Sequence, residues 1–227
     1  MSSKLRVSPP IERRLIKNNF RSRYNVPIRY IVIHDTGNPS PTADAMNHFR
    51  YFNGGYRGAS AHYFVDDKRI VQIVLDKYAA WHCGDGRGRF GITNSNSIGV
   101  ELCINRGNNM AKTYDLATAL VVSLMLRYDI PIERVVRHYD ASRKRCPGHM
   151  YGNNWEKWHS FKENLRGIMK KLRLDRKVDE NGKTKIHKRF LPKLSDGVTD
   201  ESIRGLKGTL TFIQGDITLV KIEETEF

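Results

Sequence analysis

The sequence has few cysteines, no long apolar run and no apolar segment near its N-terminus. Its 227 residues include three cysteines, an odd and small number that argues against a framework of disulfide bonds. No apolar run approaches the roughly 18 residues that span a bilayer, so no transmembrane helix and no insertion into a membrane are expected. The stretch Met1–Pro10 is basic but lacks the apolar core of a secretory signal, which predicts synthesis in the cytoplasm.

Positive charge is abundant but unevenly distributed. The formal net charge is +15, and residues 1–29 carry eight basic side chains and one acidic one. Residues 156–193 carry thirteen basic and five acidic side chains, so the rest of the chain is nearly balanced. Basic flanks of this kind favour an anionic partner, such as nucleic acid or an acidic polymer. An ordinary solvated surface explains the same charge equally well.

The hydrophobic pattern alternates between strand and helix signals. Residues 30–34 form a continuous apolar run rich in β-branched side chains, typical of a buried central strand. Residues 114–128 carry apolar side chains at steps of four, typical of a helix with one apolar face. Further strands are predicted at 61–65, 69–75, 98–104 and 134–137, and further helices at 42–52, with Thr42 as N-cap, and at 154–172. The sequence therefore predicts an α/β fold, with a mixed central β-sheet flanked by helices and a small C-terminal β extension.

Composition divides the chain into four predicted parts. Residues 1–29 are expected to form a basic N-terminal arm, irregular or partly helical, and residues 30–172 to form the main domain. Residues 173–193 are predicted to be a basic linker, and residues 194–227 contain one β-hairpin signal around the turn Gln214–Asp216. An isolated hairpin is marginal in water, so this extension should pack on the main domain, pair with another chain or form a small β module.

A histidine and a cysteine share one irregular segment of the chain. His138 and Cys146 are separated by seven residues that show no helical or strand period, and a Pro-Gly pair follows the cysteine. His34 stands where the apolar run 30–34 ends, and the end of a strand is a rigid place for a ligand. Imidazole and thiolate suit Zn²⁺, and a catalytic zinc site combines three protein ligands with an open position for water. The sequence therefore predicts zinc bound by His34, His138 and Cys146.

These three residues in this order, with Glu101 between them in Ile98–Leu102, resemble the zinc-dependent N-acetylmuramoyl-L-alanine amidase family of type 2. Many phage endolysins, some bacterial autolysins and the peptidoglycan recognition proteins belong to that family. The resemblance also includes the segment Ala80–Gly86 and Lys144, which lies two positions before the cysteine. It covers about residues 28–165.

The resemblance implies a peptidoglycan hydrolase that cleaves the amide bond between N-acetylmuramic acid and L-alanine of the stem peptide with zinc-activated water. It implies Glu101 as the general base and Lys144 as the group that stabilises the oxyanion. His62, Trp81 and His82 are expected to bind substrate, and Trp81 would offer a flat apolar wall at the rim of the groove. From the residues alone, structural roles stay open: His62 satisfied by a neighbour, Trp81 packed in the core, and Glu101 in a surface ion pair.

The implied partner is bacterial peptidoglycan, together with anionic wall polymers that would attract the basic flanks; no nucleic acid partner is expected. Residues 194–227 are a candidate wall-binding module. A protein made in the host cytoplasm without a signal peptide, and acting on the cell wall after release, fits a phage endolysin. The sequence does not specify the oligomeric state.

Three alternative functions stay open at this point. The first is a non-catalytic peptidoglycan recognition module on the same fold, although such relatives typically lack the cysteine ligand. The second is a hydrolase with Cys146 as nucleophile and His138 as base, for which a proline right after the cysteine is awkward. The third is a nucleic-acid binder with a structural zinc site, which would need a fourth ligand. His149 and His159 are expected at the surface or beside the ligands rather than among them.

Overall fold

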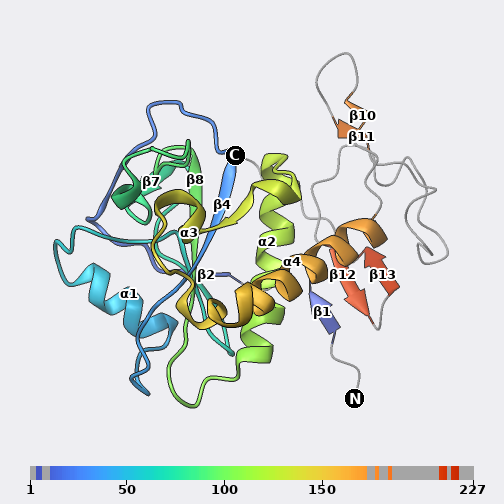
Figure 1. Cartoon of the computed structure of the whole chain (residues 1–227), viewed down its shortest axis with the longest axis horizontal. Helices are drawn as coiled ribbons and strands as arrows, with labels where there is room; N and C mark the ends of the chain where they lie inside the picture. The colour runs from blue at the N-terminus through green and yellow to red at the C-terminus, as the bar shows by residue number, and fades with distance from the viewer. Residues whose placement is uncertain are drawn as a thin grey trace. The chain divides into compact units, whose positions relative to one another are not determined.

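The structure, a computed structural model, describes residues 4–6, 11–172, 177–178, 184–185, 210–213 and 216–219 (Figure 1). The chain forms two compact units. One runs from Pro9 to Lys162, and the other combines Met1–Ser8 with Glu163–Phe227. The first unit holds all the residues of the candidate site.

A six-stranded sheet forms the centre of the first unit, in the order β2-β6-β5-β8-β4-β9. Its strands are β2 (Ile11–Arg13), β4 (Tyr30–Asp35), β5 (Tyr63–Val65), β6 (Ile70–Gln72), β8 (Ser97–Leu102) and β9 (Val135–Arg137). All neighbouring pairs are parallel except β5 and β6, which are antiparallel. Strands β4 and β8 are buried along most of their length, as the continuous apolar runs indicate. The predicted α/β fold with a mixed central sheet is confirmed.

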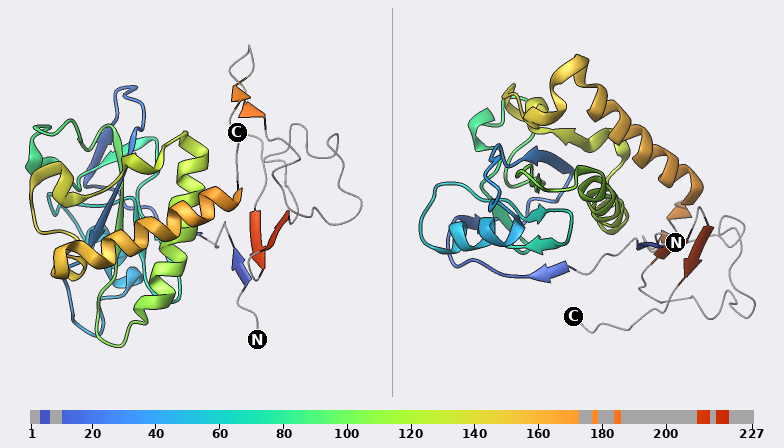
Figure 2. Two further views of the ribbon diagram at one scale, coloured as in Figure 1. Left: turned by 45° about the vertical axis from the view of Figure 1, so that its right-hand side comes forward. Right: turned by 90° about the horizontal axis from the view of Figure 1, so that it is seen from below.

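Helices cover this sheet on both faces. Helix α1 (Ala45–Asn53) contacts β5 and β6, and α2 (Met110–Tyr128) contacts β4, β5 and β8. The two views of Figure 2 show α1 and α2 on opposite sides of the strands. The other helical elements are η1 (Gly84–Gly86), η2 (Ile132–Arg134), α3 (His138–Ser142), η3 (Gly148–Met150) and α4 (Gly152–Leu172). Among the helices of the described ranges, none combines the length and apolarity needed to cross a bilayer.

Side-chain caps move the starts of α1 and α2 from their predicted positions. The Asp44 carboxylate accepts the backbone N–H of Asn47, so α1 begins after Asp44 and the predicted N-cap Thr42 is wrong. In the same way, Asn109 accepts the backbone N–H of Lys112 and starts α2 four residues before the predicted position. The apolar stripe used for the prediction is absent from this first turn, which the cap stabilises instead.

Residues 11–13 and 20–22 form strands and residues 14–19 between them are irregular, so the predicted partly helical conformation is wrong for this stretch. Strand β2 pairs with β6 and forms one edge of the central sheet, and β3 (Phe20–Ser22) pairs with β7 (Tyr78–Ala80). Between them, the side-chain amide of Asn19 donates to the backbone oxygens of Phe52 and Gly55. A short amphipathic stretch is marginal as a helix, and pairing with strands of the folded domain outweighs that local pattern.

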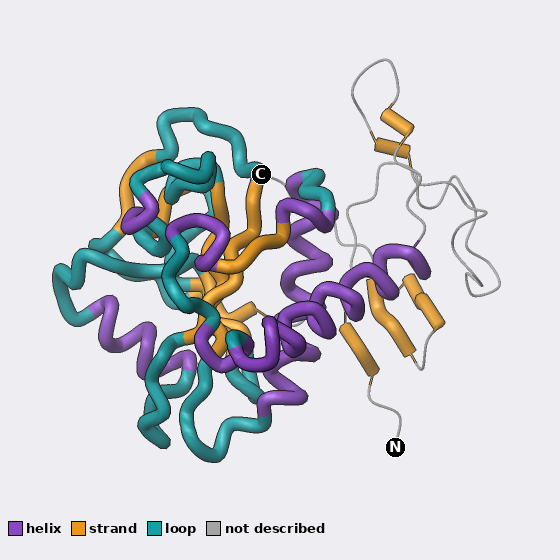
Figure 3. Tube along the Cα trace, in the orientation of Figure 1, coloured by secondary structure: helices purple, strands orange, loops and turns teal. Residues whose placement is uncertain are grey.

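Apart from the C-terminal part of α4, the described residues of the second unit form two small sheets (Figure 3). Strands β12 (Leu210–Ile213) and β13 (Asp216–Leu219) pair antiparallel, which confirms the predicted hairpin. Strand β1 (Lys4–Arg6) pairs with β12 and adds a third strand from the other end of the chain. Strands β10 (Lys177–Val178) and β11 (Thr184–Lys185) form the second sheet. The predicted division into arm, linker and extension stays a prediction, because most of residues 173–227 lie outside the described ranges.

Candidate metal centre

The central strands place three side chains next to one another on one face of the sheet. His34 is in register with Glu101 of β8, and Glu101 is in register with Phe64 of β5. Registered residues of neighbouring strands point to the same face, so the three side chains lie side by side. Phe64 belongs to a buried apolar cluster with residues of α1. The candidate site therefore lies on the face of the sheet that α1 covers.

Strand β9 and helix α3 bring the other two predicted ligands to His34. His138 is the first residue of α3 and follows β9, which pairs with β4. Cys146 follows α3, where its backbone oxygen accepts the N–H of Tyr139 at 2.9 Å and its N–H donates to the backbone oxygen of Lys144 at 2.7 Å. One ligand atom from each of His34, His138 and Cys146 lies within 4.8 Å of the others, and all three residues are buried. The folded chain therefore assembles the predicted ligand set.

The positions of these ligand atoms fit a bound metal ion. His34 Nδ1 is 3.7 Å from Cys146 Sγ, and the ring centroids of His34 and His138 are 4.6 Å apart. His138 Nδ1 is buried without a hydrogen-bond partner. Buried polar atoms are nearly always paired in folded proteins. A metal ion held by two imidazoles and a thiolate would supply the missing interaction.

A chain of hydrogen bonds determines which nitrogen of His34 faces the site. The Ser97 hydroxyl donates to the backbone oxygen of Thr93, so its oxygen accepts from His82 Nε2 at 3.1 Å. His82 Nδ1 then accepts the proton of His34 Nε2 at 3.0 Å, which leaves a lone pair on Nδ1 of His34. A Cβ at Gly99 would lie 2.6 Å from the His82 ring, so the glycine makes room for this chain.

Asp85 orients His138 in the corresponding way. Its Oδ1 lies 2.8 Å from His138 Nε2 and accepts the proton there, so the lone pair is again on the nitrogen that faces the site. Carboxylate partners of this kind fix the orientation of metal-binding imidazoles. A Cβ at Gly86 would lie 2.0 Å from the backbone oxygen of Ala141, so the glycine lets η1 pack directly against α3. The glycine-rich loop therefore positions a carboxylate behind the second histidine.

Replacing Asp85 by alanine is expected to weaken Zn²⁺ binding about 10- to 100-fold, because the ring of His138 loses the partner that fixes its proton and orientation. The affinity can be measured by competition with a chromophoric chelator. Asp115→Ala, which removes an exposed carboxylate from α2, is the matched control and should bind like the unchanged protein. Equal affinity in the two variants would contradict the orienting role of Asp85.

Burial controls ionisation of the three ligands. It lowers the pKa of His34 well below the ordinary value, and His138 acts in the same direction. It also lowers the pKa of His138, although Asp85 opposes this effect. The pKa of the Cys146 thiol is raised by burial and further by Glu101. The imidazoles therefore stay neutral and available as ligands, and the thiol needs a neighbouring cation in order to ionise.

Glu101 lies beside the ligands with one oxygen unpaired. Its Oε1 is 3.9 Å from His34 Nδ1, and its Oε2 is buried without a hydrogen-bond partner. Burial raises the pKa of Glu101 well above the ordinary value, Asp35 adds to the rise and Lys144 opposes it. A bound cation would lower this pKa. A carboxylate in this position can take up and release a proton at the site.

Lys144 and Trp81 are accessible to a molecule that binds at the site. The side chain of Lys144 is exposed, two positions before the cysteine ligand. Trp81 is half-buried, and its ring contacts the ring of Tyr56 edge to face at a centroid distance of 5.7 Å. Tyr56 is 76% exposed, so the aromatic pair is open to solvent on the Tyr56 side.

His62 and His82 lie inside the protein. His62 is 0% exposed; its Nδ1 accepts the N–H of Gly99 and its Nε2 donates to the backbone oxygen of Tyr78, both at 3.0 Å. Arg23 also lies 2.8 Å from Nε2. Both ring nitrogens of His82 are engaged in the hydrogen-bond chain to His34. The structure therefore offers no free imidazole nitrogen of either residue for a substrate, and both stabilise the strands around the site.

A further pair of residues holds the turn that follows the cysteine ligand. Asp35 Oδ2 accepts the backbone N–H and the Nδ1 proton of His149, both at 2.7 Å, and Nε2 of His149 is bonded to the Tyr114 hydroxyl at 2.7 Å. Because Asp35 follows His34, this contact connects two parts of the site. His149 thus lies beside the ligands, as predicted, and His159 is exposed.

Comparison with known proteins identifies the family. A family model described as N-acetylmuramoyl-L-alanine amidase matches residues 24–149, more than half of the chain. The amidase CwlH of Bacillus subtilis (strain 168) is 35% identical over 153 residues, which cover 67% of this chain and 58% of that protein. The chain thus spans somewhat more than half the length of this relative.

Solved structures agree with the sequence comparison. A mutant endolysin from Bacillus subtilis is 36% identical with a TM-score of 0.62, and the match covers 70% of this chain and 99% of that one. The catalytic domain of XlyA, an amidase of Bacillus subtilis (strain 168), is 35% identical with a TM-score of 0.61, covering 69% and 99%. Since the family match runs through the central sheet and contains all three candidate ligands, this chain belongs to the N-acetylmuramoyl-L-alanine amidase family.

Proposed function

We propose that this protein is a zinc-dependent peptidoglycan hydrolase that cleaves the amide bond between N-acetylmuramic acid and L-alanine of the stem peptide. The observation that carries the proposal is the buried group His34, His138 and Cys146 with the unpaired carboxylate of Glu101 beside it. Relatives that match this part of the chain are named N-acetylmuramoyl-L-alanine amidases.

Zinc is the metal that these donors suit best. Two neutral imidazoles and one thiolate are typical zinc ligands, and three protein ligands leave one position for water. Held by His34, His138 and Cys146, zinc would lower the pKa of a bound water to about 7 and would polarise a carbonyl group. His82 and Asp85 hold the two imidazoles in the required orientation from behind.

The protein's own side chains transfer the proton, stabilise the developing charge and contact the substrate. Glu101 takes a proton from the attacking water and delivers it to the leaving amine, which is general acid–base catalysis by one group. The Lys144 ammonium is exposed, carries donors only and lies two residues from a ligand, so it stabilises the negative charge that develops on the carbonyl oxygen. Trp81 with Tyr56 supplies an apolar wall for the glycopeptide.

The proposal extends to where the protein acts. The resemblance to endolysins supports synthesis in the cytoplasm and action on the wall after release. The charge distribution supports attraction of the basic flanks to anionic wall polymers. The antiparallel sheet of β1, β12 and β13 is the candidate wall-binding part. Binding to purified walls before and after removal of their anionic polymers, at two salt concentrations, tests this part separately.

Mass spectrometry of purified peptidoglycan digested by the protein tests the reaction. New fragments with a free L-alanine amino terminus are expected, and a chelator should abolish them. A cysteine-nucleophile hydrolase would keep its activity in chelator, and a recognition module would bind the wall and release nothing. Either result would contradict the proposal.

A further inference from the structure

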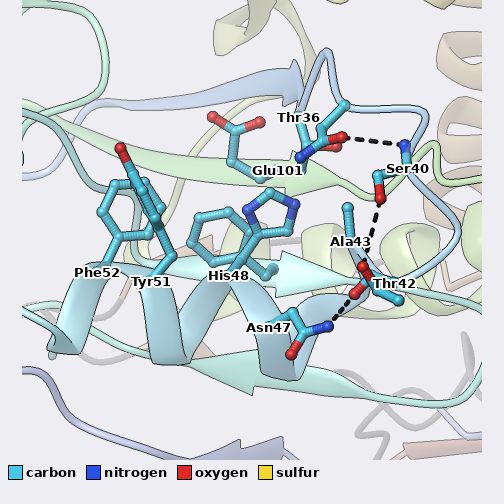
Figure 4. A pocket seen from close by; sticks show the side chains of 11 residues that line it. Thr36, Ser40, Thr42, Ala43, Asn47, His48, Tyr51, Phe52 and Glu101 are labelled. Atoms are coloured by element: carbon cyan, nitrogen blue, oxygen red, sulfur yellow. Dashed lines mark hydrogen bonds between the residues drawn. The ribbon is translucent and has the colours of Figure 1, made fainter.

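The metal centre has two sides along the sheet. On the side of β8 and β5, Glu101 lines a pocket together with side chains of α1, and the proposed reaction uses that side (Figure 4). On the other side, β9 is the last strand of the sheet, and α3, which contacts β9, leads into the turn that holds Cys146. Of the exposed side chains on this second side, the proposed reaction uses Lys144 alone.

Arginine side chains and aromatic rings contact one another in a row on this second side. The row, which we call the arginine–aromatic ridge, consists in order of contact of Phe90, Arg143, Tyr139, Arg137, Trp155, Tyr151 and Arg145. Each of its guanidinium carbons lies between 4.0 and 5.3 Å from the centroid of a neighbouring ring. A guanidinium group that stacks on a ring is restricted in orientation and keeps its N–H edge available for an anion. Three residues of the ridge are sequence neighbours of the ligands His138 and Cys146, so this charge lies beside the metal centre.

Both ends of the ridge are open to solvent. The rings at its two ends are 36% and 37% exposed, and Arg143 and Arg145 are exposed as well. In the middle of the ridge, Arg137 forms an ion pair with Asp140 at 2.7 Å. Within the described ranges, neither exposed arginine forms an ion pair with a carboxylate. The two ends therefore carry positive charge that the protein itself does not neutralise.

The neighbouring loop adds two more arginines. Arg87 and Arg89 follow η1, which packs against α3; both are exposed, and neither forms an ion pair among the described residues. Arg87 ends η1 with φ = +49°, and Arg143 ends α3 with φ = +69°. This left-handed conformation favours glycine. An arginine at both positions indicates that its charge has a role there.

These charges determine which partner the ridge suits. With Lys144, the four exposed arginines place five positive charges on two adjacent turns, and such a concentration attracts anions. A planar guanidinium group can donate two parallel N–H bonds to one phosphate, so arginines held in fixed orientation favour phosphate groups. The rings between the arginines offer apolar contact to the uncharged units that separate phosphates in a polymer. A chain of repeating phosphodiesters therefore matches the ridge better than a single anion does.

We propose that the arginine–aromatic ridge, with Arg87 on the neighbouring loop, binds a cell-wall polymer of repeating phosphodiesters. Phosphates bind Arg143 and Arg145 at the two ends, and the sugar or polyol units between them contact the exposed rings. The inference rests on the proposed function for the cell wall as the partner. It differs from attraction by the basic flanks, because it places the polymer on the first unit beside the metal centre and so holds polymer-bearing peptidoglycan next to the reacting groups.

Fluorescence titration of the zinc-loaded full chain with purified poly(glycerol phosphate) teichoic acid tests the proposal. Replacing Arg87, Arg143 and Arg145 together by glutamine is expected to weaken binding about tenfold or more. Binding by this glutamine variant should also depend less on salt, because fewer phosphates are neutralised in the complex.

A matched control replaces Lys68, Lys77 and Lys112 together by glutamine. These lysines are exposed on other parts of the same unit, so the control removes the same charge and should bind about as tightly as the unchanged protein. A further variant, Arg143→Lys with Arg145→Lys, keeps the charge but loses the planar donors, and about three- to tenfold weaker binding is expected. Zinc content and thermal unfolding establish that each variant is loaded and folded.

Equal binding by the unchanged protein and the glutamine variant would overturn the inference. An equal loss in the control would do so too, because net charge alone would then explain binding. Tighter binding of single-stranded DNA with the same number of phosphates would identify nucleic acid as the partner instead. If the glutamine variant does not fold, the variant with two lysines decides. Hydrolysis of polymer-free peptidoglycan by the unchanged protein is measured separately: its absence would refute the proposed function, whereas ridge-dependent binding of the polymer would still support the ridge.

Discussion

Replacing Glu101 by glutamine is expected to lower kcat for N-acetylmuramoyl peptide hydrolysis about 10²- to 10⁴-fold, which is the range for loss of a general acid–base group. The amide keeps the size of the side chain at the end of β8 but cannot take up the proton of the attacking water. Because Glu101 Oε1 is 3.9 Å from His34 Nδ1 and is not one of the three ligands, bound zinc should stay at the level of the unchanged protein. Turnover and zinc content, measured on the same preparation, check both parts.

Glu133→Gln makes the same change at an exposed position of η2 and should leave turnover and zinc unchanged. Full turnover in Glu101→Gln would show that another group moves the proton. Loss of zinc together with loss of turnover would show that Glu101 belongs to the coordination sphere. Glu101 would then be a zinc ligand, and its assignment as the general base would be wrong.

The ligand set could be predicted from sequence because each ligand stands at a recognisable boundary. His34 stands at the end of an apolar run, and His138 and Cys146 lie in a segment without a sequence period that a proline-glycine pair follows. The prediction that this segment is irregular throughout is wrong, because its first five residues form α3. Such boundaries can be recognised from a few neighbouring residues. Parallel pairing of β4 with β8 and β9 then brings the ends of these strands to one edge of the sheet. The carboxyl ends of neighbouring parallel strands meet there whatever the details of packing.

The residues that orient the ligands could not be predicted in this way. Asp85 is 53 positions from His138, and Asp35 is 114 positions from His149, so only the folded chain shows that each pair is bonded. An aspartate between two glycines and an aspartate next to a ligand are weak signals on their own. Both contacts depend on loop packing, which hydrophobic periodicity does not describe.

Burial distinguishes two histidines from the substrate-facing positions expected for them. His62 and His82 stand near strand ends in a stretch that resembles the rim of a groove, and a polar residue in such a place suggests contact with substrate. The ring of His82 instead lies over Gly99 and bonds to His34, and His62 is closed in by Arg23. The sequence indicates that these residues are near the site but does not distinguish its outer surface from its interior.

Replacing Cys146 by serine is expected to abolish zinc-dependent stabilisation of the fold together with catalysis. A serine hydroxyl does not ionise near neutral pH, so the site loses a charged ligand, and the loss of affinity should exceed the 10- to 100-fold that removal of an orienting partner costs. With free zinc at 1,000 times its dissociation constant, the unchanged protein gains about 4 kcal/mol in the free energy of unfolding. Thermal unfolding with and without zinc measures this gain, which should nearly vanish in Cys146→Ser.

Cys103→Ser is the control that distinguishes the loss of a zinc ligand from the general effect of replacing a buried cysteine by serine. Cys103 is buried in the apolar cluster against α1, so its replacement should destabilise the protein with and without zinc alike. The zinc-dependent gain should persist in that variant, because its sulfur is not part of the ligand group. If Cys146→Ser retained the zinc-dependent gain in the free energy of unfolding, other groups would have to complete the coordination sphere. The proposed mechanism would then lack the open position that the attacking water needs.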